Sequence, residues 1–398
     1  MGIIQEFFAK IGDAIDAFLG KFTDSVVIKS MIKVGAVFLL IIVIIIMFAS
    51  CGRKKTYKPE EFLTRMVAMT KAKRKYKAED KNNELPKNDK DVVVVPLESF
   101  VEDKTIKDLD TVIDSSSTCT GEIKIINNNG YYLFIPKLDC GDVYKTTTLY
   151  DTLVKDENIV TEGNGLYSMG DDYVFRGDSV NNFLKIGDTL YRIIRVNGDG
   201  TIRAIDTTKR TTTVWDNRYN IEKKSNNGIN NYYANGINSR VKDYIENLYD
   251  NVFTEDVKPY FTTHEICIGK RSVNDDIFDT SIECSEKIDN YPLSLVYPYE
   301  YYLVSLDQNC TGYRNVSCVN YNYFNTLGSI WTITADKDTT YYVYRIDSSG
   351  ADLVKGSLRT QAKVVVHLNG ELIVEKGIGS EEDPYIIKTF TSTKKRWH

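Results

Sequence analysis

The clearest pattern of apolar positions among polar neighbours lies between residues 173 and 206. β-Branched and aromatic residues occur throughout it, which is typical of strands. Gly187-Asp188 and the Asn-Gly-Asp-Gly run at 197–200 tolerate positive φ, so hairpin turns are expected there. The stretch therefore predicts three short strands joined by two tight turns. Its apolar positions are Phe183, Ile186, Leu190, Ile193, Val196, Ile202, Ala204 and Ile205.

Three arginines alternate with these apolar positions: Arg192, Arg195 and Arg203. Because successive side chains of a strand point to opposite faces, the arginines are predicted to lie on a solvated outer face. The alternative is a functional arginine cluster.

Two helical patterns begin the chain. Residues 1–22 place apolar side chains at helical spacing, which predicts an amphipathic helix within 1–33. This helix is expected to lie along a bilayer interface or, alternatively, to mediate oligomerisation. The uncharged run VGAVFLLIIVIIIMFA follows, and roughly 20 apolar residues span a bilayer. A single transmembrane helix is therefore predicted at 34–50.

Two features of the sequence disagree on the orientation of that helix. Residues 51–90 hold 13 Lys and Arg against 6 acids, and the positive-inside rule would keep that side in the cytoplasm. Paired cysteines and the length of the C-terminal part favour the outside, because long domains translocate largely regardless of charge. We therefore expect a single-pass protein of the cell membrane with an extracellular C-terminal body. The residues before Cys51 also resemble a bacterial lipobox, so lipidation of Cys51 is the alternative.

Six of the seven cysteines fall into three neighbouring pairs, separated by 21, 17 and 8 residues. None of these spacings is that of a CxxC zinc site, and the chain has only three histidines. Three local disulfides in an oxidising compartment are predicted, and six unrelated buried thiols are the alternative. The pairs are Cys119 with Cys140, Cys267 with Cys284, and Cys310 with Cys318.

Residues 56–145 combine one helix with a small antiparallel sheet. The predicted helix runs over 59–77, with Pro59 at its start and basic residues near its end, as the helix dipole favours. A strand at 92–95 and a hairpin at 120–136 follow, with Cys119 and Cys140 at the open ends of the hairpin. The plan resembles that of type IV pilin-like and pseudopilin-like proteins, although the prepilin cleavage signature is absent.

Residues 158–388 form the largest predicted domain. The opening strands are followed by a helix in VKDYIENLYDNVF and by separate short segments, among them YPLSLVYPYEYYLVS, FNTLGSIWTITA and GSEEDPYIIK. Taken in order, these segments resemble a family of secreted and surface domains from Firmicutes and their wall-less relatives. That family shares a YxFRG…NN…WRIIR…DGTIR opening and a DPYxI close. The resemblance implies a fold similar to C-type lectin-like and formylglycine-generating-enzyme-like domains, used mainly for display and binding.

The sequence lacks the usual signatures of catalysis. No GxSxG, HExxH, GxxxxGK[ST] or GxGxxG context occurs, and neither His264 nor His367 has a nucleophile nearby in sequence. Both histidines are predicted to be structural, and neither a metal nor a cofactor is expected.

Tyrosines crowd one region around the last cysteine pair. Tyrosine provides a large contact area at low entropic cost, which suits a binding surface, and the alternative is that these rings pack a loop-rich core. The candidate binding residues are Tyr297, Tyr299, Tyr301, Tyr313, Tyr321, Tyr323 and Trp331.

The sequence therefore predicts an α+β protein with one transmembrane helix, a pilin-like segment and a C-type lectin-like head. The expected function is binding, for adhesion or display, through an extracellular protein or glycan ligand, without catalysis. A structural subunit of an envelope assembly, oligomerising through its N-terminal and stalk helices, is the first alternative. A degenerate formylglycine-generating-enzyme-like enzyme is the second. The net charge of −5 beside a basic neck does not suit a nucleic-acid binder.

Overall fold

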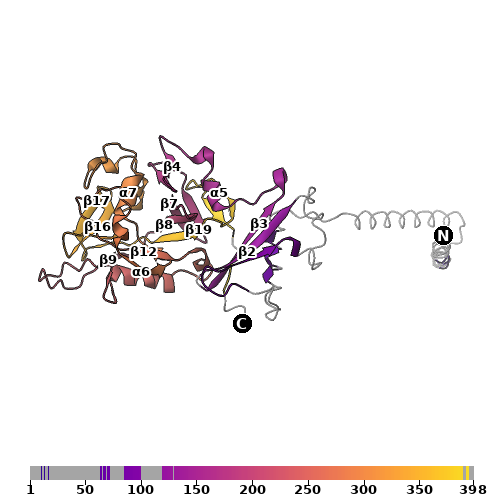
Figure 1. Ribbon diagram of the computed structural model, residues 1–398, viewed down its shortest axis with the longest axis horizontal. Helices are drawn as coiled ribbons and strands as arrows, with labels where there is room; N and C mark the ends of the chain where they lie inside the picture. Colours follow the sequence, from indigo (N-terminus) through magenta and orange to yellow (C-terminus); the bar gives the residue numbers. More distant parts are fainter. Residues whose placement is uncertain are drawn as a thin grey trace. The chain divides into compact units, whose positions relative to one another are not determined.

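The structure is a computed structural model that describes residues 85–99, 119–128, 130–388 and 391–393, together with residues 10, 13, 17, 63, 64, 66–68, 70 and 71. Strands account for 38% of it and helices for 20%. Figure 1 shows strands throughout the labelled part of the chain, with short helices between them. The chain is therefore mostly β.

The predicted fold class is wrong in two respects. The β content makes α+β too loose a description, and no helix among the residues that the structure describes is long and apolar enough to cross a membrane. This finding contradicts the predicted transmembrane helix and the single-pass localisation. The segments on which those predictions rested, 1–33 apart from three isolated residues and 34–50, lie outside the described residues, as does Cys51.

A small four-stranded sheet has the order β1-β2-β3-β22. Its strands are β1 (Val92–Pro96), β2 (Thr120–Asn128), β3 (Tyr131–Asp139) and β22 (Thr391–Thr393). All three pairings are antiparallel, and β2 and β3 form the hairpin that the sequence predicts. The fourth strand comes from the C-terminal end of the chain, so the first and last described strands belong to one sheet.

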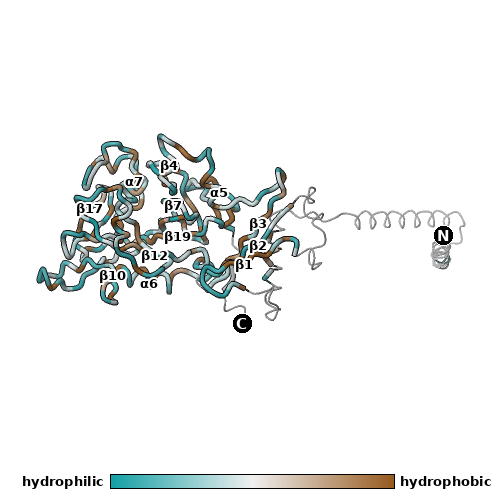
Figure 2. Tube along the Cα trace, in the orientation of Figure 1, coloured by the Kyte–Doolittle hydropathy of each residue, from teal (hydrophilic) through white to brown (hydrophobic). Residues whose placement is uncertain are grey.

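The predicted helix before this sheet packs onto it. The described residues between 63 and 71 are helical, and Leu63 and Met66, three positions apart, are buried. The Nζ atom of Lys71 lies 4.9 Å from the centre of the Phe134 ring on β3. Figure 2 shows the apolar residues of β1 and β2 in brown on this part of the chain.

The largest sheet has nine strands. Along its main path the order is β14 (Leu293–Ser294), β19 (Val365–Asn369), β8 (Thr201–Asp206), β7 (Thr189–Val196), β6 (Phe183–Ile186), β21 (Tyr385–Ile387) and β20 (Val374–Lys376). Off this path, β5 (Asp172–Arg176) pairs with β7 and with β4 (Gly165–Met169). Strands β6, β7 and β8 are the three strands predicted from the sequence, with Gly187 and Gly200 at positive φ in the turns.

A five-stranded sheet has the order β17 (Gly350–Lys355), β16 (Tyr342–Asp347), β15 (Ile330–Ala335), β18 (Arg359–Gln361) and β9 (Thr212–Val214). Two fully buried tryptophans tie its strands together. The indole of Trp215 donates a hydrogen bond to the carbonyl oxygen of Thr332 at 3.0 Å, and that of Trp331 donates to the carbonyl oxygen of Thr213 at 2.9 Å. Each buried indole nitrogen therefore has a partner.

Two ribbons and three further α-helices complete the part of the chain that the structure describes. The ribbons pair β10 (Tyr233–Ala234) with β11 (Ile237–Asn238) and β12 (His264–Cys267) with β13 (Lys287–Tyr291). The α-helices are α5 (Leu149–Leu153), α6 (Arg240–Asn251) and α7 (Pro298–Val304). Single 3-10 turns are η4 (Gly141–Val143), η5 (Asp156–Asn158), η6 (Lys258–Tyr260), η7 (Ile282–Ser285), η8 (Val316–Val319) and η9 (Tyr323–Leu327).

Helix α6 is the helix predicted in VKDYIENLYDNVF. It begins because the Ser239 side chain accepts a hydrogen bond from the Lys242 backbone N–H, which satisfies a donor of the first turn. Val241, Ile245 and Leu248 recur at helical spacing and are buried.

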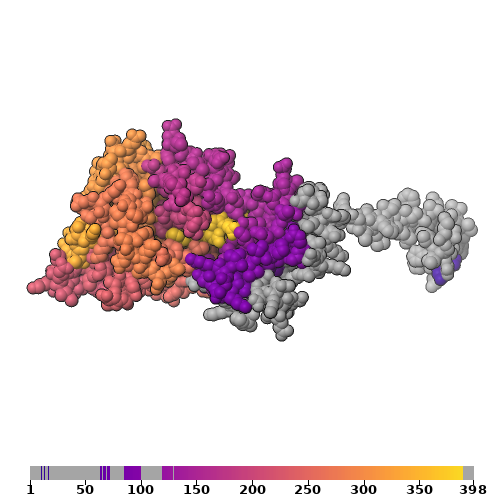
Figure 3. Space-filling model, in the orientation of Figure 1, coloured from indigo at the N-terminus to yellow at the C-terminus, as the bar shows by residue number. Residues whose placement is uncertain are grey.

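Direct contacts join the small sheet to the rest of the chain. The Lys124 and Lys137 ammonium groups lie 2.6 Å and 2.7 Å from the Glu371 carboxylate. The buried Asn128 side chain donates a hydrogen bond to the carbonyl oxygen of Pro259 at 2.7 Å. In Figure 3 the purple residues of the small sheet lie against the yellow C-terminal residues.

Candidate functional site

Two of the three arginines of the opening strands are buried, and the third is half-buried. Arg192 is 4% exposed and Arg203 is 1% exposed, and the Arg195 side chain is 15% exposed. The prediction that they lie on a solvated face is therefore wrong. Strands β7 and β8 lie inside the nine-stranded sheet, and both faces of these strands are largely covered.

Arg203 is the centre of a buried polar cluster. Its guanidinium forms an ion pair with the Glu300 carboxylate and donates a hydrogen bond to the carbonyl oxygen of Leu295 at 2.9 Å. One terminal nitrogen lies 2.8 Å from Nε2 of His367, and the group also stacks 4.9 Å from the centre of the Tyr297 ring. This network joins α7 to β8 and β19.

Glu300 also organises the start of α7. Its Oε2 accepts a hydrogen bond from the backbone N–H of Tyr297, the residue that precedes the helix, at 2.9 Å. Glu300 is 2% exposed, so the whole cluster is shielded from water. A ligand in solution cannot reach it in this conformation, and we assign it to the stability of the fold.

Two stacked histidines border the same cluster. The rings of His264 and His367 lie 3.3 Å apart at their centres. Burial and the nearby Arg203 charge lower the pKa of His264 to about 3, and burial together with His264 holds the pKa of His367 well below its ordinary value. Both imidazoles are therefore neutral near pH 7, and His367 accepts from Arg203.

A second buried ion pair supports the region next to the Cys267–Cys284 disulfide. Arg271 pairs with Glu283 at 2.8 Å, and both side chains are almost completely buried. The same guanidinium donates to the carbonyl oxygens of Asp276 and Asp279. Arg271 therefore holds the loop between the two cysteines in one conformation.

A groove of about 570 Å³ lies next to helix α6. It lies between the β10–β11 ribbon, helix α6 and the β12–β13 ribbon. We call it the α6–β13 groove. Its lining residues are Tyr232, Tyr233, Gly236, Asn238, Lys242, Ile245, Glu246, Ile266, Lys287, Ile288, Asp289, Asn290 and Tyr291.

Two tyrosines supply hydrogen-bond donors to the α6–β13 groove. Burial and the field of Glu246 raise the pKa of Tyr232 and of Tyr291 above the ordinary value, and Asp250 adds to the effect on Tyr291. Both phenols are therefore protonated at neutral pH. Neither hydroxyl has a hydrogen-bond partner within the described part of the chain, so each is free to donate to a bound molecule.

Ring packing holds these two tyrosines in place. Tyr232 lies 6.0 Å from the buried Trp215, and Tyr291 contacts Tyr249 edge to face at 5.7 Å. The rings are thus fixed before any ligand arrives, which reduces the entropic cost of binding.

Charged side chains on helix α6 are already paired with each other. Lys242 forms an ion pair with Glu246 one turn later, and Asn238 donates a hydrogen bond to the same carboxylate at 2.7 Å. The Lys242 ammonium also lies 5.5 Å from the centre of the Tyr233 ring. This wall of the groove is therefore ordered and close to neutral.

The opposite wall of the groove follows the edge of a strand. All five residues of β13 line it, although successive side chains of a strand point to opposite faces. Residues of both faces of β13 therefore border the groove, together with Ile266 of β12. Among the strands that the structure describes, β13 pairs only with β12, so its other edge is open.

The tyrosines proposed from the sequence lie elsewhere, and most are inside the molecule. Tyr297, Tyr299, Tyr301, Tyr323 and Trp331 are each 5% exposed or less. These side chains pack the core, which was the alternative interpretation of the cluster.

Two members of the proposed set reach the surface to different extents. Tyr313 is half-buried, and its hydroxyl donates a hydrogen bond to Asp352 at 2.9 Å. Tyr321 is 59% exposed. A binding role stays a prediction for these two.

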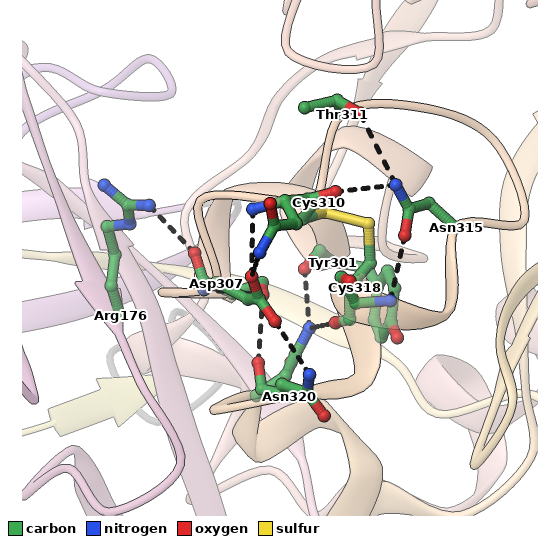
Figure 4. Close-up of a disulfide and its surroundings, with 12 residues drawn as sticks. Arg176, Tyr301, Asp307, Cys310, Thr311, Asn315, Cys318 and Asn320 are labelled. Atoms are coloured by element: carbon green, nitrogen blue, oxygen red, sulfur yellow. Dashed lines mark hydrogen bonds between the residues drawn. A yellow bond between two sulfur atoms is a disulfide. The ribbon is translucent and has the colours of Figure 1, made fainter.

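The three predicted disulfides are confirmed. Cys119 is bonded to Cys140, Cys267 to Cys284 and Cys310 to Cys318. Figure 4 shows the last of these, which closes a loop that side-chain hydrogen bonds also stabilise. Asn315 of that loop donates to the carbonyl oxygen of Asn309 at 2.6 Å, and Asn320 donates to Asp307 beside the loop at 2.7 Å.

Comparison of the chain with protein-family models, curated proteins and solved structures finds no match in any of the three. The resemblance to the surface-domain family therefore stays a prediction. Within the part of the chain that the structure covers, no three His, Cys, Asp or Glu residues are grouped so that they could hold a metal ion.

The residues of the α6–β13 groove were missed by the sequence argument. Tyr232 and Tyr233 stand in the turn-rich NNYYANG segment before α6, and Tyr291 ends the KIDNY segment after Cys284. The sequence feature that could have indicated these tyrosines is an aromatic residue beside an asparagine-rich turn. The high density of tyrosine around the last cysteine pair instead marked residues that mostly pack the core.

Proposed function

We propose that this chain is an extracytoplasmic binding protein and that its α6–β13 groove receives an extended polypeptide segment of a partner protein. The observation that carries the proposal is the open edge of β13 along one wall of the groove. Edge strands bind extended peptides by adding a strand, with main-chain hydrogen bonds for affinity and side-chain contacts for specificity.

The donors of the groove support this assignment. The Tyr232 and Tyr291 hydroxyls are protonated and unpartnered, so they can bind carbonyl oxygens of an extended chain. Three disulfides are typical of proteins that fold in an oxidising compartment outside the cytoplasm. We assign the buried ion pairs and the neutral histidines to the stability of the fold, and a binding function without catalysis is consistent with that assignment.

The experiment is a selection of random twelve-residue peptides displayed on phage against the full-length chain. Peptides that bind are then synthesised, and their Kd is measured for wild type and for the Tyr232→Phe/Tyr291→Phe variant. Each lost hydrogen bond is worth about 0.5–1.5 kcal/mol, so the double variant should bind roughly ten- to a hundredfold more weakly.

Tyr219→Phe is the matched control, because Tyr219 is exposed and does not line the groove. It should leave the Kd unchanged. Selected peptides that bind the double variant as tightly as wild type would contradict the proposal, as would a selection that yields no binding peptide.

A further inference from the structure

Arg192 differs from the other buried arginines in having no carboxylate partner. Arg203 pairs with Glu300 and Arg271 pairs with Glu283, each at hydrogen-bonding distance. No carboxylate among the described residues lies within ion-pair distance of the Arg192 guanidinium. Arg192 is nevertheless only 4% exposed.

Neutral groups and aromatic rings hold the Arg192 guanidinium in position. Its Nε donates to Oδ1 of Asn182 at 2.9 Å, and one terminal nitrogen donates to Oγ1 of Thr326 at 3.1 Å. The rings of Phe183 and Tyr323 lie 4.5 Å and 4.2 Å from the guanidinium carbon. The second terminal nitrogen makes no hydrogen bond to any residue that the structure describes.

This guanidinium contributes to the wall of a pocket of about 460 Å³, separate from the α6–β13 groove. Thr326 and Phe183, which hold it, line the same pocket. Burial lowers the pKa of Arg192, which means that its charge lacks full compensation. A buried charge without a partner is costly, and an anionic group on a ligand would supply the missing compensation.

The rim of this pocket carries the opposite charge. Asp178, Glu381 and Glu382 line it and are exposed, and the hydroxyls of Ser179 and Ser380 lie among them. A simple anion would meet these carboxylates as it enters. A molecule with both a carboxylate and an ammonium group can place the carboxylate against Arg192 and the ammonium group beside the acids of the rim.

We propose that the Arg192 pocket binds a small amino-carboxylate zwitterion of the free amino-acid class. The carboxylate accepts hydrogen bonds from the free face of Arg192, and the ammonium group faces the acids of the rim. A basic amino acid fits best, because the lining carries one cationic side chain against three acidic ones. The site is independent of the peptide groove, so either assignment can fail without the other.

The test is calorimetric titration of the full-length chain with L-lysine, with cadaverine, which lacks the carboxylate, and with hexanoate, which lacks both ammonium groups. L-Lysine should bind, and each truncated probe should bind at least about tenfold more weakly, because each lacks at least one charge-assisted contact. Equal binding of cadaverine and lysine would overturn the proposal, and so would no binding of lysine at millimolar concentration.

Two variants assign the contacts. Arg192→Gln should abolish lysine binding, whereas Arg314→Gln is the control, because Arg314 is exposed and pairs with Asp352 outside the pocket. Glu381→Gln/Glu382→Gln changes only exposed rim residues and so tests the site even where Arg192→Gln fails to fold. It should weaken lysine about tenfold without weakening hexanoate, and unchanged lysine affinity would refute the role of the rim.

Discussion

Removal of the Glu300 carboxylate tests the role assigned to the buried cluster. Glu300 accepts hydrogen bonds from two nitrogens of Arg203 and from the backbone N–H of Tyr297. Arg203, which is 1% exposed in the wild type, keeps its charge in the Glu300→Ala variant and has no other carboxylate in the cluster. The helix α7 also loses the acceptor at its N-terminus.

The size of the effect follows from these contacts. Breaking a buried ion pair by removal of one partner costs about 3–5 kcal/mol, because the remaining charge stays uncompensated. Loss of the cap adds about 1 kcal/mol. A domain is stable by only about 5–15 kcal/mol, so Glu300→Ala should remove a large part of the free energy of unfolding.

Urea unfolding followed by the fluorescence of the buried tryptophans measures this change. Glu381→Ala is the matched control, since it removes an exposed carboxylate and should change stability by less than about 0.5 kcal/mol. The double variant Arg203→Met/Glu300→Leu removes both charges and should be more stable than Glu300→Ala alone. A loss below about 1 kcal/mol in Glu300→Ala, or a double variant that is less stable still, would refute the assignment.

Three further predictions concern stability. Folding lowers the pKa of His264 from 6.5 to about 3, so below pH 6.5 the unfolded chain binds a proton that the folded chain excludes. The free energy of unfolding should therefore decrease by about 1.4 kcal/mol per pH unit as the pH falls below 6.5. Urea titrations at several pH values measure this slope, and His264→Gln should reduce it. Cys310→Ala/Cys318→Ala opens a bridge between cysteines 8 residues apart and should cost about 2–3 kcal/mol, seen as a lower Tm by calorimetry; an unchanged Tm would contradict it. Gly228→Ala should destabilise the chain, because its Cβ would lie 2.2 Å from the Asp216 carbonyl oxygen at a φ of +99°, whereas alanine at the open turn position Gly312 should be tolerated in the same assay.

Local patterns in the sequence predicted local structure well. The strands β6, β7 and β8, the β2–β3 hairpin and helix α6 all lie where alternation, turn residues and helical spacing placed them. The disulfides could be predicted for the same reason, because each joins two cysteines that are close in sequence. The first pair also lies at the ends of one hairpin.

Burial was harder to predict because it depends on what covers a strand. Alternation on β7 and β8 separates two faces but does not say whether the second face meets water. Arg192 and Arg203 lie on central strands of a nine-stranded sheet, where Asn182, ten residues away, accepts a hydrogen bond from Arg192 and Glu300 pairs with Arg203 from a distant part of the chain. The sequence spacing between Arg203 and Glu300 is 97 residues, and no local pattern links them.

The tyrosine cluster illustrates the same limit. Its members are close together in sequence, yet Tyr301 and Tyr323 are fully buried while Tyr321 is 59% exposed. The groove tyrosines Tyr232 and Tyr291 lie far apart in sequence and meet only through the packing of α6 and β13. The sequence composition therefore indicated tyrosine as a residue type suited to binding, but it did not indicate which tyrosines line the groove.

Hydrogen exchange of the β13 backbone tests the proposed binding mode most directly. A peptide selected on the full-length chain is added at saturating concentration, and amide exchange is followed by mass spectrometry with and without it. Strand addition should slow exchange in peptides covering Lys287–Tyr291, because new hydrogen bonds form along that edge, while the Gly350–Lys355 strand serves as an unaffected reference. Protection confined to other segments, with unchanged exchange over Lys287–Tyr291, would contradict the account.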